Sequence, residues 1–268
     1  MGEILKMSTQ EQVINRINDV FDQKKDILNV YFTAGYPMFD DTIRIARNLQ
    51  NAGADMLEIG IPFSDPLADG TTIQESSSKA LANGMTIHKL LDELKDLRKY
   101  IELPVLMMGY LNPILQFGVN PFCEACECVE IDGLIIPDLP IEEYIDNYKE
   151  IFTAHGIHNI FLISPNTSEE RIRQIDEWSD GFIYMVSSSS ITGAKKGLES
   201  KQLSYFNRID QMNLKNARLI GFGISDHVSF SQACRYAHGA IIGSAFINQL
   251  KNDASEKAIK NFVTSIKK

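Results

Sequence analysis

The sequence predicts an α/β protein in which eight parallel strands, each followed by a helix, close into a single (β/α)8 barrel domain over residues 1–268. Three observations predict this fold. Eight short apolar runs recur along the chain, each is followed by helical material, and a length of 268 residues suits one barrel. An open doubly wound sheet is the alternative, but the glycine-rich dinucleotide fingerprint G-x-G-x-x-G is absent from the sequence.

The first expected element is an N-terminal helix. Ser8 followed by Glu11 fits a capping box. The apolar residues of this segment repeat at helical spacing, namely Val13, Ile14, Ile17, Val20 and Phe21. The buried strand 28–32 follows and ends at the turn 33–37, and the helix 40–51 stops near Gly53.

The strand–helix alternation then continues to the end of the chain. The remaining expected strands are 55–60, 104–108, 133–136, 159–163, 182–186, 218–221 and 240–242. Between them, helical spacing of apolar residues is clearest at Ile87, Leu90, Leu91, Leu94 and Leu97. Further amphipathic stretches are 142–155, 169–178 and 227–238.

The composition excludes several classes of protein. A net charge of −9 without basic clusters argues against binding to nucleic acid or to anionic membrane surfaces. No window approaches ~18 consecutive apolar residues, so no membrane span is expected. The N-terminal residues lack the apolar run of a signal peptide. We therefore expect a cytoplasmic protein.

The cysteines do not predict a metal site. Cys123, Cys126 and Cys128 crowd into one run, which is unlike a disulfide scaffold and indicates a reducing compartment. A zinc site needs four ligands, and no second pair follows at finger spacing. On a helix, Cys123 and Cys126 share a face while Cys128 turns away, so packing is the favoured explanation. None of the five histidines follows a strand beside a serine or cysteine, which argues against a nucleophilic triad.

Two carboxylates mark the second strand and the loop after it. In a (β/α)8 barrel, reactive residues lie at the carboxyl ends of the strands. Glu58 interrupts an apolar strand and faces opposite to Leu57 and Ile59, and Asp69 lies in the following loop. Carboxylates in different environments can divide acid and base work between them. The alternative is a rim glutamate paired with a lysine and an aspartate that only makes a turn.

Glycines after the last strands predict a phosphate site. Segment 221–225 follows the seventh strand, and segment 243–245 follows the eighth and opens a helix. Glycines let backbone N–H groups approach an anion, and a helix N-terminus adds a favourable dipole. Thr192 and Gly193, after the sixth strand, would form a third side of this phosphate site. The alternative is that these glycines only form tight turns.

Aromatic side chains near the strand ends would suit a flat apolar ligand. These are Tyr31, Tyr110, Tyr184 and Phe222. Ordinary core or rim packing is the alternative for each of them.

The segment 58–70, EIGIPFSDPLADG, closely resembles the signature of the tryptophan synthase alpha chain family. Similar segments run through nearly the whole chain: 32–37, 108–113, 133–140, 164–167, 192–193, 221–225 and 243–245. The resemblance implies a (β/α)8 barrel with an extra N-terminal helix, which fits residues 11–24. It also implies cleavage of indole-3-glycerol phosphate to indole and glyceraldehyde 3-phosphate in tryptophan biosynthesis.

The resemblance also implies roles for individual residues. Glu58 and Asp69 would be the catalytic pair of this retro-aldol reaction. The phosphate would be held by Gly193, Gly223, Gly243 and Ser244. The indole ring or the glycerol chain would be surrounded by Tyr31, Tyr110, Ile135, Leu162, Tyr184, Thr192 and Phe222. The reaction requires no metal and no organic cofactor in this chain.

The partner implied by the resemblance is a tryptophan synthase beta chain in an α2β2 complex. That beta chain carries pyridoxal phosphate and joins indole to serine. Pro62, Asp65 and Asn112 are candidates for the surface that faces it. One departure concerns the serine run 187–190, which we expect to form a lid. Many family members have arginine and glycine where Ser188 and Ser190 stand, which puts in doubt how the closed lid is locked.

Two other functions remain possible from the sequence. One is a different phosphate-binding barrel enzyme, such as an indole-glycerol-phosphate synthase or a phosphoribosyl isomerase. The synthase depends on a lysine at a strand end, and the expected strands lack an obvious one. The other is a barrel without activity that binds a phosphorylated ligand and regulates a partner. Intact Glu58 and Asp69 argue against this second function.

Overall fold

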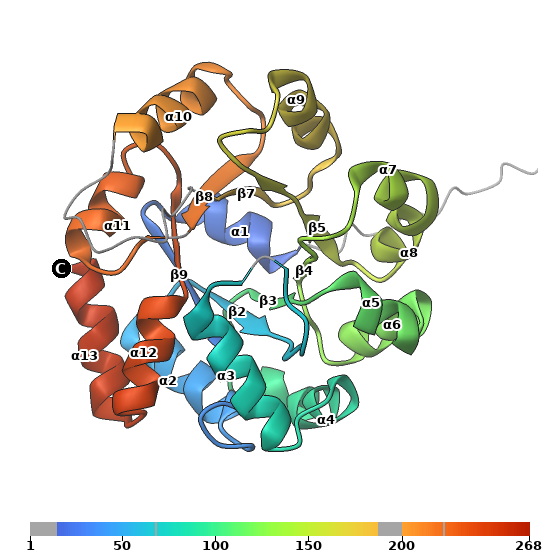
Figure 1. Cartoon of the computed structure of the whole chain (residues 1–268), viewed down its shortest axis with the longest axis vertical. Helices are drawn as coiled ribbons and strands as arrows, with labels where there is room; N and C mark the ends of the chain where they lie inside the picture. Colours follow the sequence, from blue (N-terminus) through green and yellow to red (C-terminus); the bar gives the residue numbers. More distant parts are fainter. Residues whose placement is uncertain (1–14, 68, 187–199, 222) are drawn as a thin grey trace, which may run out of the picture.

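The computed structural model describes residues 15–67, 69–186, 200–221 and 223–268. Their strands form one parallel sheet wrapped into a barrel, with helices around it (Figure 1). The strands are β1 (Ile27–Thr33), β2 (Met56–Gly60), β3 (Val105–Met108), β4 (Gly133–Ile135), β5 (His158–Ile160), β6 (Leu162–Ile163), β7 (Phe182–Val186), β8 (Ala217–Gly221) and β9 (Gly239–Ile242). Their order in the sheet is β5-β4-β3-β2-β1-β9-β8-β7-β6.

The barrel closes through its fifth predicted strand. β5 and β6 lie at the two ends of the strand order, yet only Phe161 separates them in the sequence. β5 pairs with β4, and β6 pairs with β7. Between them, the Tyr184 backbone N–H donates to the Phe161 carbonyl at 2.9 Å. The prediction of eight strand segments is therefore confirmed. The fifth segment is divided because it changes its hydrogen-bonding partner at Phe161.

The helices largely follow the expected pattern. They are α2 (Thr42–Ala52), α3 (Thr71–Ala82), α4 (Ile87–Glu93), the 3-10 helix η1 (Leu94–Lys99), α5 (Leu111–Phe117), α6 (Val119–Cys128), α7 (Ile141–Glu143), the π-helix η2 (Tyr144–Tyr148), α8 (Lys149–Ala154), α9 (Glu169–Trp178), α10 (Ser200–Gln211), α11 (His227–Ala233), α12 (Ser244–Asn252) and α13 (Glu256–Lys267). The bounds of α9 are those predicted. α2 ends at Ala52, and its C-cap Gly53 has a left-handed φ of 98°. The amphipathic stretch predicted over 227–238 forms a helix only as far as Ala233. The prediction is wrong after that residue, because the chain there forms hydrogen-bonded turns.

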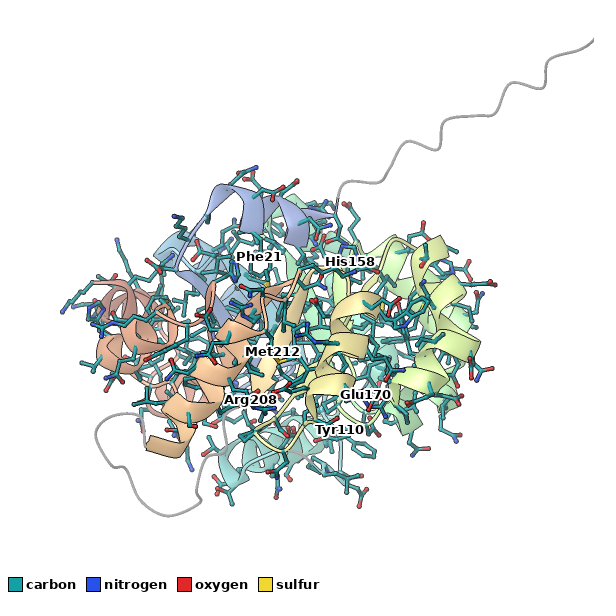
Figure 2. The ribbon with its side chains drawn as sticks, turned by 90° about the horizontal axis from the view of Figure 1, so that it is seen from above. Phe21, Tyr110, His158, Glu170, Arg208 and Met212 are labelled. Carbon is teal, nitrogen blue, oxygen red and sulfur yellow. The ribbon has the colours of Figure 1, made fainter. Side chains whose placement is uncertain are left out.

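The helix α1 (Arg16–Gln23) covers the amino-terminal ends of the barrel strands (Figure 1). Its N-cap is Asn15, whose side chain accepts a hydrogen bond from the Ile17 backbone at 3.0 Å. The capping box expected at Ser8 and Glu11 lies outside the described residues. In Figure 2, Phe21 lies at the end covered by α1, and Tyr110 lies at the opposite end. The carboxyl ends of the strands are therefore at the end away from α1.

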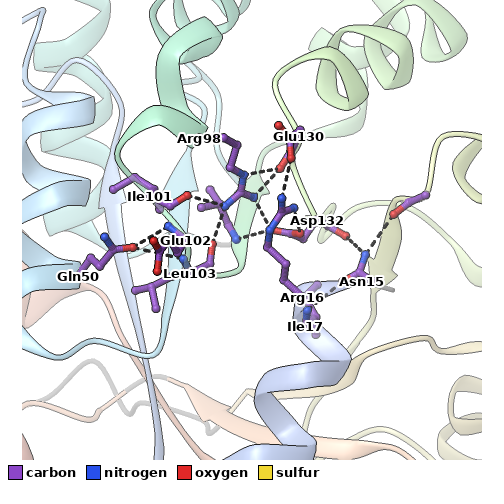
Figure 3. A network of polar contacts seen from close by, with 12 residues as sticks. Asn15, Arg16, Ile17, Gln50, Arg98, Ile101, Glu102, Leu103, Glu130 and Asp132 are labelled. Atoms are coloured by element: carbon purple, nitrogen blue, oxygen red, sulfur yellow. Dashed lines mark hydrogen bonds and ion pairs between the residues drawn. The ribbon is translucent and has the colours of Figure 1, made fainter. Parts of the chain in front are cut away.

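A polar network joins α1 to the start of β4 (Figure 3). The Asp132 carboxylate accepts hydrogen bonds from Arg16 at 3.0 Å and from Arg98 at 2.6 Å. It also accepts from the backbone N–H of Val105 at 2.7 Å. Because the Asp132 side chain is only 3% exposed, these donors, rather than water, stabilise its carboxylate.

Replacing Asp132 by alanine is expected to lower the free energy of unfolding by about 3–5 kcal/mol, because it leaves a charge buried without its partner. The charge concerned is that of Arg98, whose side chain is 12% exposed. Urea unfolding followed by circular dichroism measures the change. Asp96→Ala is the matched control, since Asp96 pairs with Lys99 at 2.7 Å on the open surface. Equal losses in the two variants would contradict this role of Asp132.

Two further features bear on the class of protein. Within the described ranges, no helix has both the length and the apolar character needed to cross a membrane. Cys123 and Cys126 are buried on α6 while Cys128 is exposed, as the helical spacing predicted. Burial raises the pKa of the Cys123 thiol to about 12, so this thiol keeps its proton and packs as an apolar group.

Candidate functional site

Glu58 lies in the middle of β2 and points into the barrel interior. Its side chain is 1% exposed. Oε2 accepts a hydrogen bond from Nδ2 of Asn29 at 3.0 Å. Among the described residues, Oε1 has no hydrogen-bond partner. The alternative of a rim glutamate paired with a lysine is therefore wrong. Glu58 is a buried carboxylic acid with one oxygen held and the other free for a ligand.

Asp69 lies in the loop between β2 and α3, next to Glu58. The two side chains are close enough that the Asp69 charge raises the pKa of Glu58. The side chain of Tyr110 forms a hydrogen bond with the Asp69 carboxyl. The Gln74 side chain holds the loop by donating to the Asp69 carbonyl at 2.8 Å. The structure therefore brings together the two acids that the sequence predicted as a pair.

The environments of the two acids separate their pKa values. Burial raises the pKa of Glu58 to about 8, with a further increase from Asp69 and a decrease from the Asn29 hydrogen bond. Burial raises the pKa of Asp69 to about 6, against the lowering effect of the Tyr110 hydrogen bond. At pH 7 the site therefore holds Glu58 mainly as the acid and Asp69 mainly as the carboxylate. A proton donor and an anion lie side by side.

Two buried tyrosines face these acids from β1 and β7. Tyr31 is the register partner of Glu58 in the β1–β2 ladder. The pKa of Tyr184 is raised by burial and then by the charges of Glu58 and Asp69. The third tyrosine, Tyr110, packs its ring against Phe63 with centroids 5.3 Å apart. The structure places these three tyrosines near the two carboxyl groups, and their contact with a flat ligand stays a prediction.

Two strand-end glycines make room for the tyrosine rings. A Cβ atom at Gly60 would lie 2.1 Å from the Tyr31 hydroxyl oxygen, and one at Gly221 would lie 2.3 Å from the Tyr184 ring. Any larger residue would therefore displace the ring. This role of Gly60 does not show in the sequence, because the need for glycine arises only from a ring on the neighbouring strand.

Gly60→Ala is expected to destabilise the protein by about 1–3 kcal/mol, as overpacked sites do, and to lower activity by moving Tyr31. The double variant Gly60→Ala/Tyr31→Leu removes the ring that the new methyl group meets. We therefore expect Gly60→Ala to lower the free energy of unfolding much less in the Tyr31→Leu background than in the wild type. Urea unfolding of the wild type, the two single variants and the double variant measures this difference. A cost independent of residue 31 would show that Tyr31 is not the obstacle.

The turn between β9 and α12 lies beside Tyr31. Gly243 precedes α12, and a Cβ atom there would lie 3.5 Å from Cδ1 of Tyr31. Ser244 is the first residue of α12 and is exposed, and Gly223 is exposed with a φ of 77°. Of the predicted phosphate residues, Gly223 therefore lies on the loop after β8, while Gly243 and Ser244 lie where β9 leads into α12. Gly193 lies outside the described residues.

The remaining predicted contacts are only partly described. Ile135 is buried at the end of β4, and Leu162 is the ladder partner of Tyr184. Thr192, Phe222 and the serine run 187–190 lie outside the described residues. Asn29 is the functional candidate that the sequence analysis missed. Its signal is a polar residue within an apolar strand, two positions before Tyr31 and so on the same face.

No group of three or more His, Cys, Asp or Glu residues in the described part of the chain is arranged to hold a metal ion. The site is built from carboxyl, amide and phenol groups on β1, β2 and β7 and on the loops after β2 and β3.

Comparison with known proteins identifies relatives over almost the whole chain. The family model for the tryptophan synthase alpha chain matches residues 17–267. The tryptophan synthase alpha chain of Flavobacterium psychrophilum is 54% identical over 253 residues, which cover 94% of this chain and 100% of that protein. The crystal structure of the alpha chain from Legionella pneumophila has a TM-score of 0.83 and 33% identity, covering 94% of this chain and 96% of that one. A Mycobacterium tuberculosis tryptophan synthase structure has a TM-score of 0.84 and 27% identity, covering 94% and 96%.

These matches decide between the functions that the sequence left open. The two alternatives, a different barrel enzyme and a barrel without activity, are both wrong. The relatives match almost the whole chain, and they are tryptophan synthase alpha chains. The chain belongs to the tryptophan synthase alpha chain family.

Proposed function

We propose that Glu58 and Asp69 carry the proton transfers of this chain's reaction. The chain is a carbon–carbon lyase of tryptophan biosynthesis that cleaves indole-3-glycerol phosphate to indole and glyceraldehyde 3-phosphate. The observation that carries the proposal is the pairing of a buried acid, with a pKa of about 8, and a neighbouring carboxylate, with a pKa of about 6. Retro-aldol cleavage of an indole needs one group of each kind.

An indole carbanion is a poor leaving group, so Glu58 first donates its proton to C3 of the indole ring. Positive charge then builds at the ring nitrogen, and Asp69 accepts a hydrogen bond from the ring N–H. The Glu58 carboxylate next removes the proton of the adjacent side-chain hydroxyl. The carbon–carbon bond breaks, its electron pair moves into the ring, and the aldehyde forms while Glu58 regains its proton.

We assign the binding roles to the residues around this pair. The indole ring and the glycerol chain contact Tyr31, Tyr110, Ile135, Leu162, Tyr184, Thr192 and Phe222. The phosphate is held by Gly193, Gly223, Gly243 and Ser244. The start of α12 supports the phosphate assignment, because the N-terminus of a helix favours an anion.

The partner is a tryptophan synthase beta chain, and we propose an α2β2 complex in which pyridoxal phosphate belongs to the beta chain. The candidate contact surface carries Pro62, Asp65 and Asn112, on the segments that follow β2 and β3. Two exposed apolar side chains on the same segments support this surface. Leu67 is 87% exposed and Leu115 is 45% exposed, and a partner that covers them would remove their apolar surface from water.

A coupled assay for glyceraldehyde 3-phosphate tests the assignment of the pair and of the partner. The purified chain should release the aldehyde from indole-3-glycerol phosphate, and the rate should rise when beta chain is added. Leu67→Asp should weaken the rise and leave the rate of the isolated chain unchanged. Equal rates with and without a demonstrably bound beta chain would contradict the partner proposal. Wild-type rates from Glu58→Gln would contradict the catalytic assignment.

A further inference from the structure

Asn29 occupies an unusual place for an asparagine. It lies in β1 with its side chain fully buried, between the apolar residues Leu28 and Val30. A buried amide costs free energy unless it forms hydrogen bonds. Within the described part of the chain, the Oδ1 atom of Asn29 has no partner, so only its Nδ2 atom is bonded. The fold therefore accepts an incompletely bonded amide at this position.

The one hydrogen bond of this amide goes to Glu58. Nδ2 of Asn29 donates to Oε2 at 3.0 Å, while Oε1 of Glu58 has no partner among the described residues. In a neutral carboxylic acid, one oxygen is a carbonyl acceptor and the other carries the hydrogen. Because Oε2 accepts from Asn29, Oε2 is the carbonyl oxygen and Oε1 carries the proton.

We propose that Asn29 is a positioning residue for this reaction, which fixes the Glu58 carboxyl so that Oε1 is the oxygen that donates and recovers the proton. The inference rests on the proposed catalytic role of Glu58. Asn29 acts through Glu58 in both states of the catalytic cycle, since Oε2 accepts from Nδ2 whether Glu58 is the acid or the carboxylate.

The surroundings of Glu58 disfavour its carboxylate form, which this hydrogen bond stabilises. Asp69 and the phenols of Tyr31 and Tyr184 face it from the β2–α3 loop, from β1 and from β7. Burial and the negative charge of Asp69 both disfavour the Glu58 carboxylate. In the described residues, the Asn29 amide is the one group whose effect lowers the pKa of Glu58. Without it, the carboxylate that must remove the hydroxyl proton loses its stabilising donor.

The variant Asn29→Leu removes the donor while keeping nearly the same shape. We expect the basic limb of the pH dependence of kcat/KM, which reports Glu58, to move upward by about one pH unit or more. We expect kcat at pH 7 to fall about tenfold, while KM changes less than about threefold. Asn159→Leu is the matched control, because Asn159 is a buried asparagine of β5. Its basic limb should stay at the wild-type pH.

An unchanged basic limb in folded Asn29→Leu would overturn the inference and leave Asn29 a structural role only. The wild-type chain provides a test that needs no folded variant at position 29. The side-chain ¹⁵N–¹H₂ resonances of Asn29 should shift with the titration of Glu58, whose pKa is about 8, and this shift should be lost in Glu58→Gln. Asn29 resonances that do not shift with the titration of Glu58 would also overturn the inference. Activity retained in Glu58→Gln would instead refute the proposed function itself.

Discussion

Glu58→Gln is expected to lower kcat by about 10²- to 10⁴-fold, because the amide cannot donate a proton to the indole ring or remove one from the hydroxyl group. KM should change little, since glutamine has nearly the same shape in the same buried position. The release of glyceraldehyde 3-phosphate gives kcat, and calorimetric titration with the substrate gives its affinity. An inactive variant that also fails to bind substrate would show that Glu58 serves binding rather than proton transfer.

The same variant should be more stable than the wild type at high pH. Glu58 has a pKa of about 8 in the folded chain, above the ordinary glutamate pKa of 4.5, so folding favours its protonated form. This group therefore opposes folding increasingly as pH rises from 4.5 to about 8, and has no such effect below 4.5. We expect the free energy of unfolding of Glu58→Gln to exceed that of the wild type by about a few kcal/mol at pH 8 and by much less at pH 5. Equal gains at both pH values would contradict the raised pKa of Glu58.

Asp69→Asn is expected to lower kcat by about 10²-fold or more, because a neutral amide does not stabilise the positive charge that builds at the ring nitrogen. The wild-type kcat/KM should depend on pH as a bell. The rate should fall below about pH 6 as Asp69 gains its proton, and above about pH 8 as Glu58 loses its proton. The two values belong to an interacting pair, so they are apparent pKa values of that pair.

Direct titration separates Asp69 from the substrate, since a phosphate monoester also titrates near pH ~6. ¹³C NMR of the carboxyl groups in the substrate-free chain should show one aspartate that titrates near pH 6 and one glutamate that titrates near pH 8. The aspartate signal should be missing in Asp69→Asn. Two carboxyl groups that both titrate near pH 4 would contradict the division of acid and base roles.

Local sequence patterns predicted most of the scaffold. The apolar runs identified every strand segment, and the period of α9 gave its bounds, because periodicity reports which face of an element is buried. The same spacing placed Cys123 and Cys126 inside and Cys128 outside. Glu58 was identifiable as a carboxylate within an apolar strand, and Asp69 as its neighbour on the next loop. These are features of a single element or of one strand and its loop.

Contacts between distant segments decided the rest. The bond from Asn29 to Glu58 spans 29 positions, and the network at Asp132 joins segments more than 100 positions apart. Neither leaves a local period in the sequence, because each partner packs within its own strand or helix. The glycine required at residue 60 reflects a ring on the neighbouring strand. The sequence by itself determined the barrel and the two acids at its carboxyl end. Only the tertiary structure decided which of them is protonated, because a pKa depends on desolvation and nearby charges that the folded chain alone assembles.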